Sequence, residues 1–192
     1  MDKKISPKVT IYIVNFNYAK YIEQAIQSVL SQTFNNYELF IIDDGSTDNS
    51  KEVIQKHENT DKIFIVFQKN KGLNKTNNIA LKLARGKYIM RLDADDYLDP
   101  RAIDIMVREL ERYDEYAVVF PDYYLIDEKN QIIEQVRRHD FGNNVTLLDQ
   151  PAHGACTLIR RDVLTQLGGY DEDFICQDCY DIWLKIIPNF KV

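Results

Sequence analysis

The sequence lacks any long apolar run. Nowhere do its 192 residues approach the roughly 20 apolar residues in a row that a membrane-spanning helix needs. The N-terminal residues 1–8 also lack the apolar core of a secretory signal peptide. We therefore expect a cytoplasmic protein without an integral membrane segment, for which peripheral contact with a membrane stays open.

Cysteine is scarce as well. The chain has three, Cys156, Cys176 and Cys179, and an odd, sparse set argues against a disulfide framework. Cys176 and Cys179 have the spacing of a metal-binding pair, but no second pair and no suitable histidines accompany them. We therefore expect neither disulfides nor a structural zinc site.

Basic charge is in the minority. The 24 Lys and Arg residues are outnumbered by 30 Asp and Glu, the net charge is −6 and no basic block offsets it. This balance argues against a nucleic-acid partner. An acidic protein that binds a polyanion needs a metal ion or localised donors. With 45% hydrophobic residues, a chain of this length is expected to form one globular domain.

Strand-like and helix-like segments alternate through the first half of the chain. Continuous apolar runs predict strands, and apolar residues at helical spacing predict helices. Their alternation with short loops is typical of βαβ units and a mostly parallel sheet. The expected strands are 9–14, 37–42, 63–67 and one starting at 88, and the expected helices are 19–32, about 53–57 and 73–84, the last ending at Gly86 in a left-handed cap.

The second half follows a different pattern. Asp99 and Pro100 suit the N-cap and first position of a helix, which we expect over 100–113. Turn residues between two apolar segments predict a hairpin of 123–126 and 132–136. We also expect strands at 117–120 and 155–159, helices at 161–167 and 178–187, and a mobile polar loop at 137–150, all in one continuous fold with the first half.

The strand that starts at Tyr88 carries Asp93, Asp95 and Asp96 at its end. In a buried parallel strand these acids would emerge at the carboxyl end, where open α/β sheets bind ligands. Carboxylates this close repel one another unless a cation compensates them, and Mg²⁺ or Mn²⁺ holding a diphosphate suits such oxygen ligands. The alternative is a solvated acidic turn before the next helix.

The two earlier strands end in residues that suit a nucleotide. Phe16 could stack on a base, with core packing as the alternative. Asp44 could accept a hydrogen bond from a ring N–H of uracil or guanine, or it could serve in the turn before Ser46. Gly45 lets the backbone approach closely.

Together these segments resemble the family 2 glycosyltransferases of the GT-A fold. The resemblance rests on residues 11–17, 41–48, 88–96, 154–161, 168–173 and 178–185, in the expected order over nearly the whole chain. It implies an α/β fold with a mostly parallel central sheet flanked by helices and a smaller mixed β region on the acceptor side. It also implies that 1–99 is the nucleotide-sugar-binding half and 100–192 the acceptor-side half of one domain.

The resemblance assigns roles in donor binding. Asp44 matches the carboxylate that reads the base. The segment Asp93-Ala94-Asp95 matches the DxD motif, whose first carboxylate lies near the ribose and whose last binds Mn²⁺ or Mg²⁺. On this basis the donor site comprises Val14, Phe16, Asn17, Asp44, Gly45, Ser46, Asp93 and Ala94, and the metal ligands are Asp95 and Asp93.

The resemblance also implies a reaction. Asp178 lies where the family has the acid that deprotonates the acceptor hydroxyl, and Asp181 is a second candidate because the local residue order differs from the family motif. Direct attack of that hydroxyl on the anomeric carbon would invert it. We expect transfer of a hexosyl or N-acetylhexosaminyl group, with a UDP-sugar favoured as donor. The acceptor would be a carbohydrate or a lipid-linked molecule in bacterial-type polysaccharide or glycoconjugate synthesis.

Some positions depart from the family pattern. Asn77 stands where the family has Arg, so one contact to the diphosphate or base is expected to be missing. His153 is a candidate for the acceptor side, with plain exposure as the alternative, and Trp183 is expected in the core. The family continues with another strand and helices where this sequence ends, so we expect the chain to be short on the acceptor side and to retain donor binding.

Three other functions compete with glycosyl transfer. A non-catalytic nucleotide-sugar-binding module is compatible with the altered acidic motif. A sugar-phosphate nucleotidyltransferase would show a Gly-rich, basic loop after the first strand, which residues 15–18 do not provide. A receiver-like signalling domain with Asp43 or Asp44 as phosphate acceptor leaves the acids after the fourth strand unexplained.

Overall fold

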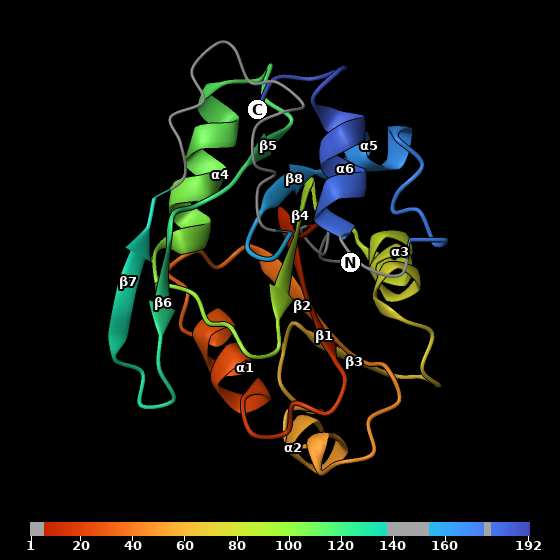
Figure 1. Ribbon diagram of the computed structural model, residues 1–192, viewed down its shortest axis with the longest axis vertical. Coiled ribbons are helices and arrows are strands. Elements are labelled where there is room, and N and C mark those ends of the chain that lie inside the picture. The colour runs from red at the N-terminus through yellow and green to blue at the C-terminus, as the bar shows by residue number, and fades with distance from the viewer. Residues whose placement is uncertain (1–5, 138–153, 175–177) are drawn as a thin grey trace, which may run out of the picture.

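The computed structural model describes residues 6–137, 154–174 and 178–192, and its centre is a six-stranded sheet between two layers of helices (Figure 1). The strand order is β3-β2-β1-β4-β8-β5. The strands are β1 (Val9–Asn15), β2 (Tyr37–Asp43), β3 (Ile63–Phe67), β4 (Tyr88–Asp93), β5 (Val118–Val119) and β8 (Leu158–Arg160). The helices are α1 (Ile22–Leu30), α2 (Ser50–Gln55), α3 (Leu73–Leu83), α4 (Ala102–Arg112), α5 (Arg161–Gln166) and α6 (Asp178–Ile186).

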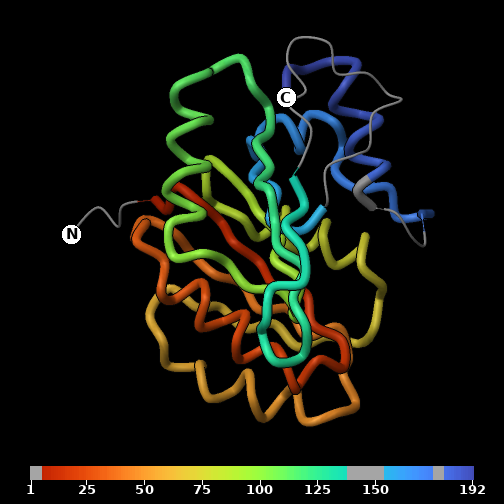
Figure 2. The backbone as a smooth tube through the Cα atoms, turned by 60° about the vertical axis from the view of Figure 1, so that its left-hand side comes forward, coloured from red at the N-terminus to blue at the C-terminus, as the bar shows by residue number. Residues whose placement is uncertain are grey.

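The mostly parallel sheet predicted from the sequence is confirmed. Strands β1 to β4 run parallel, whereas β8 is antiparallel to both of its neighbours, β4 and β5. The predicted hairpin forms a separate two-stranded sheet, β6 (Tyr123–Ile126) and β7 (Ile132–Val136). Figure 2 turns this hairpin toward the viewer, and its turn reaches α1, where Gln24 Nε2 donates to Asn130 Oδ1 at 3.3 Å.

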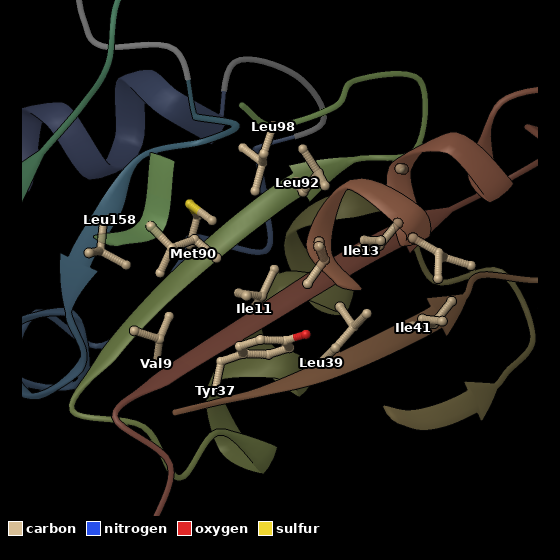
Figure 3. Packing of buried hydrophobic residues seen from close by; sticks show 14 of the residues in the cluster. Val9, Ile11, Ile13, Tyr37, Leu39, Ile41, Met90, Leu92, Leu98 and Leu158 are labelled. Atoms are coloured by element: carbon tan, nitrogen blue, oxygen red, sulfur yellow. The ribbon is translucent and has the colours of Figure 1, made fainter. Parts of the chain in front are cut away.

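The core lies on both faces of the central sheet because side chains alternate along each strand. On β1, Ile11 and Ile13 pack in the layer with α1, α2 and α4. Tyr12 points the other way, into the layer with α3, α5 and α6. Figure 3 shows the first of these layers, with Ile11 between Leu39 of β2 and Met90 of β4. Strands buried on both faces explain the continuous apolar runs in the sequence.

The order in which the chain adds strands to the sheet reverses between β1 and β4. The chain places β2 and β3 on one side of β1 and then crosses over to place β4 on the other side. The register aligns Asn15 with Asp43 and Val14 with Asp93, so the carboxyl ends of all three strands lie at the same edge. Open α/β sheets bind ligands at this kind of switch point.

Gly86 does not have the conformation predicted from the sequence. The described glycines with positive φ are Gly45, Gly72, Gly168 and Gly169, so a left-handed cap at Gly86 is wrong. Glycine is needed there because a Cβ would lie 2.5 Å from the backbone nitrogen of Thr10 and 2.7 Å from the carbonyl oxygen of Tyr88. The close approach of two chain segments therefore explains this glycine.

Several predicted boundaries also shift. Helix α4 begins two residues later than expected, because Asp99 Oδ1 accepts from the backbone N–H of Arg101 at 2.8 Å and forms a turn before the helix. The strand expected at 155–159 is β8 and begins at Leu158. Trp183 is in the core, 4% exposed, as predicted. The predicted polar loop at 137–150 falls almost entirely outside the described residues.

Within the described ranges, every helix is too short or too polar to cross a membrane.

The core packing leads to a prediction about stability. Ile11 is fully buried in the central strand, whereas Ile105 on α4 is 50% exposed. Ile11→Ala should lower the free energy of unfolding by about 2–5 kcal/mol, because it leaves a cavity. The matched change Ile105→Ala should cost no more than about 0.5 kcal/mol. Urea unfolding of both variants measures the difference, and equal losses would contradict the described packing.

Candidate functional site

The loops after β1 and β2 are joined by side-chain hydrogen bonds. Asn15 is fully buried, and its Nδ2 donates to Asp43 Oδ2 at 2.8 Å and to Ser46 Oγ at 3.0 Å. The backbone N–H of Asn17 donates to the same Ser46 oxygen at 2.9 Å. Hydrogen bonds offset the cost of burying the Nδ2 group of Asn15. These contacts therefore hold the ends of the two strands as one unit.

Asn17 holds the second loop through its side chain. Its Oδ1 accepts from the backbone N–H groups of Thr47 at 2.7 Å and Asp48 at 3.3 Å. Its own backbone is left-handed, with a φ of 64°, a conformation that Asn adopts more readily than most residues. Sequence analysis placed Asn17 and Ser46 in the donor site. In the structure both residues shape the loops of that edge.

Asp44 is buried, 2% exposed, and its carboxylate organises the segment after β3. Oδ1 accepts from Gln68 Nε2 at 2.7 Å and from the backbone N–H of Lys71 at 2.9 Å. Oδ2 accepts from the backbone N–H of Gly72 at 2.9 Å. The turn role considered as an alternative belongs to the neighbouring Asp43, whose Oδ1 accepts from the backbone N–H of Ser46 at 3.0 Å.

Gly45 is required by this arrangement. Its φ is +84°, and a Cβ at this position would lie 2.7 Å from the backbone nitrogen of Asn70. Two backbone segments therefore touch directly above Asp44, a contact that only glycine permits.

Aromatic side chains lie exposed at the same edge. Phe16 is 44% exposed and Tyr18 is 41% exposed, so core packing, the alternative considered for Phe16, does not hold. Val14 is half-buried and lies opposite Asp93 in the register of β1 and β4. An exposed ring beside buried polar loops can serve as a flat, apolar surface for a ligand.

The end of β4 separates its acids by environment. Arg91 is buried, and its Nε lies 2.8 Å from Asp93 Oδ1. Ala94 is buried, whereas Asp95 and Asp96 are exposed. Asp93 therefore has a cationic partner from its own strand. The charge of Asp95 remains open to solvent.

The acids after β4 fit a divalent cation only in a particular way. Among the described residues, no three His, Cys, Asp or Glu side chains come together as a metal-binding cluster. Mg²⁺ and Mn²⁺, however, are commonly held by one or two carboxylates together with phosphate oxygens of a substrate. The exposed Asp95, with Asp93 two residues before it, suits such a shared site.

The pKa of Tyr18, in the loop after β1, is affected by Asp95. The negative charge of Asp95 is the main reason that the pKa of Tyr18 is raised above its ordinary value, followed by partial burial and by Asp93. A phenolate is disfavoured next to a carboxylate. The loops after β1 and β4 are therefore electrostatic neighbours.

The second half of the chain reaches the same acids through Cys156. Its backbone N–H donates to the carbonyl oxygen of Arg91 at 2.7 Å. Burial raises the pKa of its thiol, and the nearby charges of Asp96 and Asp93 raise it further. A thiol in this environment stays protonated at neutral pH. Cys156 thus lies beside the acids that follow β4, and its thiol is unreactive.

Helix α6 carries the two candidates for the catalytic base. Asp178 is its first residue, and the side chains of Asp178 and Cys179 lie outside the described part of the structure, as do His153 and Cys176. Asp181 is 5% exposed, and its Oδ2 accepts from Lys185 Nζ and from the backbone N–H of Asp171, each at 2.8 Å. Asp181 thus ties its helix to the segment before it.

Sequence analysis missed Gln68 and Arg91. Gln68 Nε2 bridges Asp44 Oδ1 and Thr76 Oγ1, at 2.7 and 2.9 Å. Both residues act on acids that were singled out, but only the fold brings Gln68 to Asp44. For Arg91 a signal existed, since a charged residue in the apolar β4 run needs a partner when it is buried.

Comparison of the sequence with protein families and curated proteins gives a consistent result. The model of the family "Glycosyl transferase family 2" matches residues 10–168. The chain is 38% identical over 128 residues to a chondroitin synthase of Escherichia coli, a match that covers 66% of this chain and 19% of the relative. It is 32% identical over 189 residues to an uncharacterized glycosyltransferase of Rickettsia prowazekii, covering 94% of this chain and 58% of that protein.

Solved structures share the fold. TarS of S. aureus in complex with UDP-GlcNAc matches with a TM-score of 0.76 and 21% identity, covering 93% of this chain and 52% of that one. The mannosyltransferase PcManGT of Pyrobaculum calidifontis in complex with GDP-Man and Mn²⁺ matches with a TM-score of 0.74 and 20% identity, covering 98% of this chain and 54% of that one. The chain thus spans about half the length of these neighbours.

The electrostatic link between Tyr18 and Asp95 can be measured. Asp95→Asn should lower the pKa of Tyr18 toward its ordinary value, because removal of the carboxylate charge makes the phenolate less unfavourable. Titration of the Tyr18 ring followed by NMR at alkaline pH measures this change. Asp61→Asn, which alters an exposed acid after α2, is the control and should leave the Tyr18 pKa in place. An unchanged pKa in Asp95→Asn would contradict the described geometry.

Proposed function

Since this chain belongs to glycosyl transferase family 2, whose model matches residues 10–168, we propose that it is a metal-dependent, inverting enzyme that transfers a sugar from a UDP-sugar to an acceptor hydroxyl. The observation that carries the proposal is the edge at which β1, β2 and β4 end together. There Asp44, the proposed contact of the nucleobase, and the acids of β4 lie at one switch point of the sheet.

The nucleotide would bind over the loops after β1 and β2. Phe16 offers an exposed ring for stacking on the base. The carboxylate of Asp44 accepts three hydrogen bonds from the chain, and a carboxylate can accept about four. In the proposal, a ring N–H of the nucleobase would use the remaining acceptor position. The backbone at Val14 and Gly45 would line the same pocket, as in the family resemblance.

The diphosphate would lie at the end of β4. Asp95 would hold a Mn²⁺ or Mg²⁺ ion together with phosphate oxygens, and the bound ion would stabilise the charge of the departing diphosphate. Arg91 restrains the carboxylate of Asp93 through an ion pair of 2.8 Å between Nε and Oδ1, and in the proposal this carboxylate would lie near the ribose. Support for the metal comes from the exposed charge of Asp95.

Asp178 is the better candidate for the base. The carboxylate of Asp181 is buried and already accepts from Lys185 and from the backbone of Asp171. A base must reach the acceptor hydroxyl within hydrogen-bond distance. In the proposed step the hydroxyl oxygen attacks the anomeric carbon, its proton passes to Asp178, and the bond from that carbon to the diphosphate breaks. This single displacement inverts the anomeric centre.

A second candidate function is a nucleotide-sugar-binding module without turnover. It is favoured by Asn77, which is fully buried and accepts from the hydroxyl of Tyr12 at 3.3 Å. Where the family has Arg, this chain therefore has a neutral side chain that faces the core. The acceptor, the sugar and any role in polysaccharide or glycoconjugate synthesis belong to the same proposal, since the chain covers only part of its relatives.

Calorimetric titration with UDP and with GDP, each with and without Mn²⁺, tests donor binding. UDP should bind more tightly than GDP, and Mn²⁺ should strengthen its binding. The ratio of UDP affinity with Mn²⁺ to UDP affinity without it should be at least about tenfold smaller in Asp95→Ala, because this change deletes the exposed carboxylate ligand. Asp61→Ala serves as the control for loss of a surface charge. If Mn²⁺ has the same effect on UDP binding in Asp95→Ala as in the original chain, the metal assignment is wrong.

The choice of base can be tested by comparing Asp178→Asn with Asp181→Asn. With water as the acceptor, hydrolysis of UDP-GlcNAc to GlcNAc and UDP should fall by about 10²–10⁴-fold in Asp178→Asn, because the attacking water loses its base, and UDP affinity should be retained. Asp181→Asn should mainly lower the melting temperature, because it removes the negative partner of Lys185 from a partly buried pair. Undiminished UDP release in Asp178→Asn would exclude that residue as the base. UDP binding without any release by the original chain would favour the non-catalytic module.

A further inference from the structure

A short segment, residues 169–174, lies between α3 and α6 and leads from α5 toward the start of α6. In Figure 1 it descends on the right-hand side from α5 toward α3. We call this segment the strap. It comes immediately before residues 175–177, which the structure does not describe, and Asp178 begins the helix after them. The strap is therefore close in sequence to the first turn of α6.

Asn78 of α3 binds the backbone of the strap. Its Nδ2 donates to the carbonyl oxygen of Tyr170 at 2.8 Å, and its Oδ1 accepts from the N–H of the same residue at 2.9 Å. Nδ2 also donates to Glu172 Oε1 at 3.0 Å. A side-chain amide donates and accepts side by side, as a backbone peptide group does. Asn78 thus satisfies one strap residue as a neighbouring strand would.

Asn74, one turn earlier on the same face of α3, binds the other end of the strap. It is 5% exposed, and its Nδ2 donates to the carbonyl oxygens of Asp171 and Phe174, both at 2.9 Å. The approach is close: a Cβ on Gly169 would lie 2.5 Å from Asn78 Oδ1. The strap therefore lies directly on α3.

The opposite side of the strap is held by α6. Asp181 Oδ2 accepts from the backbone N–H of Asp171 at 2.8 Å. Lys185 Nζ donates to the carbonyl oxygen of Gly169 at 2.8 Å and forms an ion pair with Asp181. The strap thus connects α3 and α6 through hydrogen bonds on both sides.

The N-terminus of α3 is held by Asp44, at the edge of the sheet where β1, β2 and β4 end. Its N-cap is Gly72, whose N–H donates to Asp44 Oδ2 at 2.9 Å, and the N–H of Lys71 donates to Asp44 Oδ1 at 2.9 Å. Helix α3, which carries Asn74 and Asn78, is therefore positioned by Asp44, the carboxylate proposed to bind the nucleobase. A continuous series of hydrogen bonds runs from Asp44 through α3 and the strap to α6.

We propose that Asn74 and Asn78 are positioning residues for glycosyl transfer: they place the first turn of α6, and Asp178 with it, relative to a donor held at Asp44. This inference rests on the proposed function of Asp178 and adds residues that touch neither donor nor acceptor. Helix propensity favours the same reading, because Asn is a poor helix former and α3 has three of them among eleven residues.

Hydrogen exchange of the 192-residue chain tests the placement without any assay of activity. In Asn74→Ala and Asn78→Ala, the backbone amides of residues 170–174 and of α6 should exchange at least about tenfold faster, while those of β1 and β2 stay unchanged. Ala is the better helix former, so α3 itself should not be weakened. Lys82→Ala, at an exposed position of α3, is the matched control and should leave α6 unchanged.

A second variant separates the two halves of the Asn78 amide. Asn78→Asp keeps the acceptor for the N–H of Tyr170 but turns a carboxylate oxygen toward the Tyr170 carbonyl and Glu172. It should speed exchange in α6 at least as much as Asn78→Ala does, because like charges and facing acceptors repel. Unchanged exchange in α6 in all three variants, or the same acceleration throughout the chain, would overturn the proposal.

Kinetics then show whether the placement matters for transfer. With UDP-GlcNAc as the probe, UDP release by Asn78→Ala should show a kcat lowered by about 10- to 100-fold and a KM within about threefold of the original, since misplacing a base by about an ångström costs rate rather than binding. A raised KM with an unchanged kcat would overturn the positioning role. If the original chain releases no UDP, the proposed function fails, and the exchange data still decide whether Asn74 and Asn78 place α6.

Discussion

The burial of one carboxylate, that of Asp44, governs much of this structure. A buried charge is tolerated only when hydrogen bonds replace the lost water, and Asp44 obtains three of them from the segment after β3. That segment must therefore wrap over the end of β2, which brings Asn70 against Gly45 and excludes any side chain there. The same wrapping fixes Gly72 as the residue before α3. The position of a helix thus follows from the solvation of one acid.

The acids at the end of β4 obey a different constraint. Asp93, Asp95 and Asp96 lie within four residues, and their mutual repulsion opposes folding unless it is relieved. Pairing of Asp93 with the buried Arg91 relieves part of it. Exposure of Asp95 and Asp96 to water lowers the remaining cost. The result is one carboxylate with a cationic partner, Asp93, and two exposed carboxylates after it, an arrangement that suits a metal shared with a ligand.

The sequence predicted what depends on local pattern. Strands β1, β2 and β3 and the hairpin follow from apolar runs and turn residues, and the gathering of Asp44 and Asp93 at one edge follows from parallel topology. Contacts between distant residues were not readable, because nothing near Gln68 points to Asp44 and nothing near Asn78 points to Tyr170, 92 positions away. Gly86 was misassigned for the same reason: its neighbour, Thr10, is remote in sequence.

Two of the connections between the halves of the chain are unlike in kind. Beside β4, the second half adds β8 to the sheet, so that Leu158 and Met90 share a ladder and a core layer. Around α3, the connection is polar, because the side-chain amides of Asn74 and Asn78 bind the backbone of the strap. A ladder fixes an element along its whole length, whereas a few amide contacts fix only its position and can open locally at lower cost. The sheet therefore fixes the ends of β1, β2 and β4 along their ladders, whereas the position of the strap depends on individual polar contacts with α3 and α6.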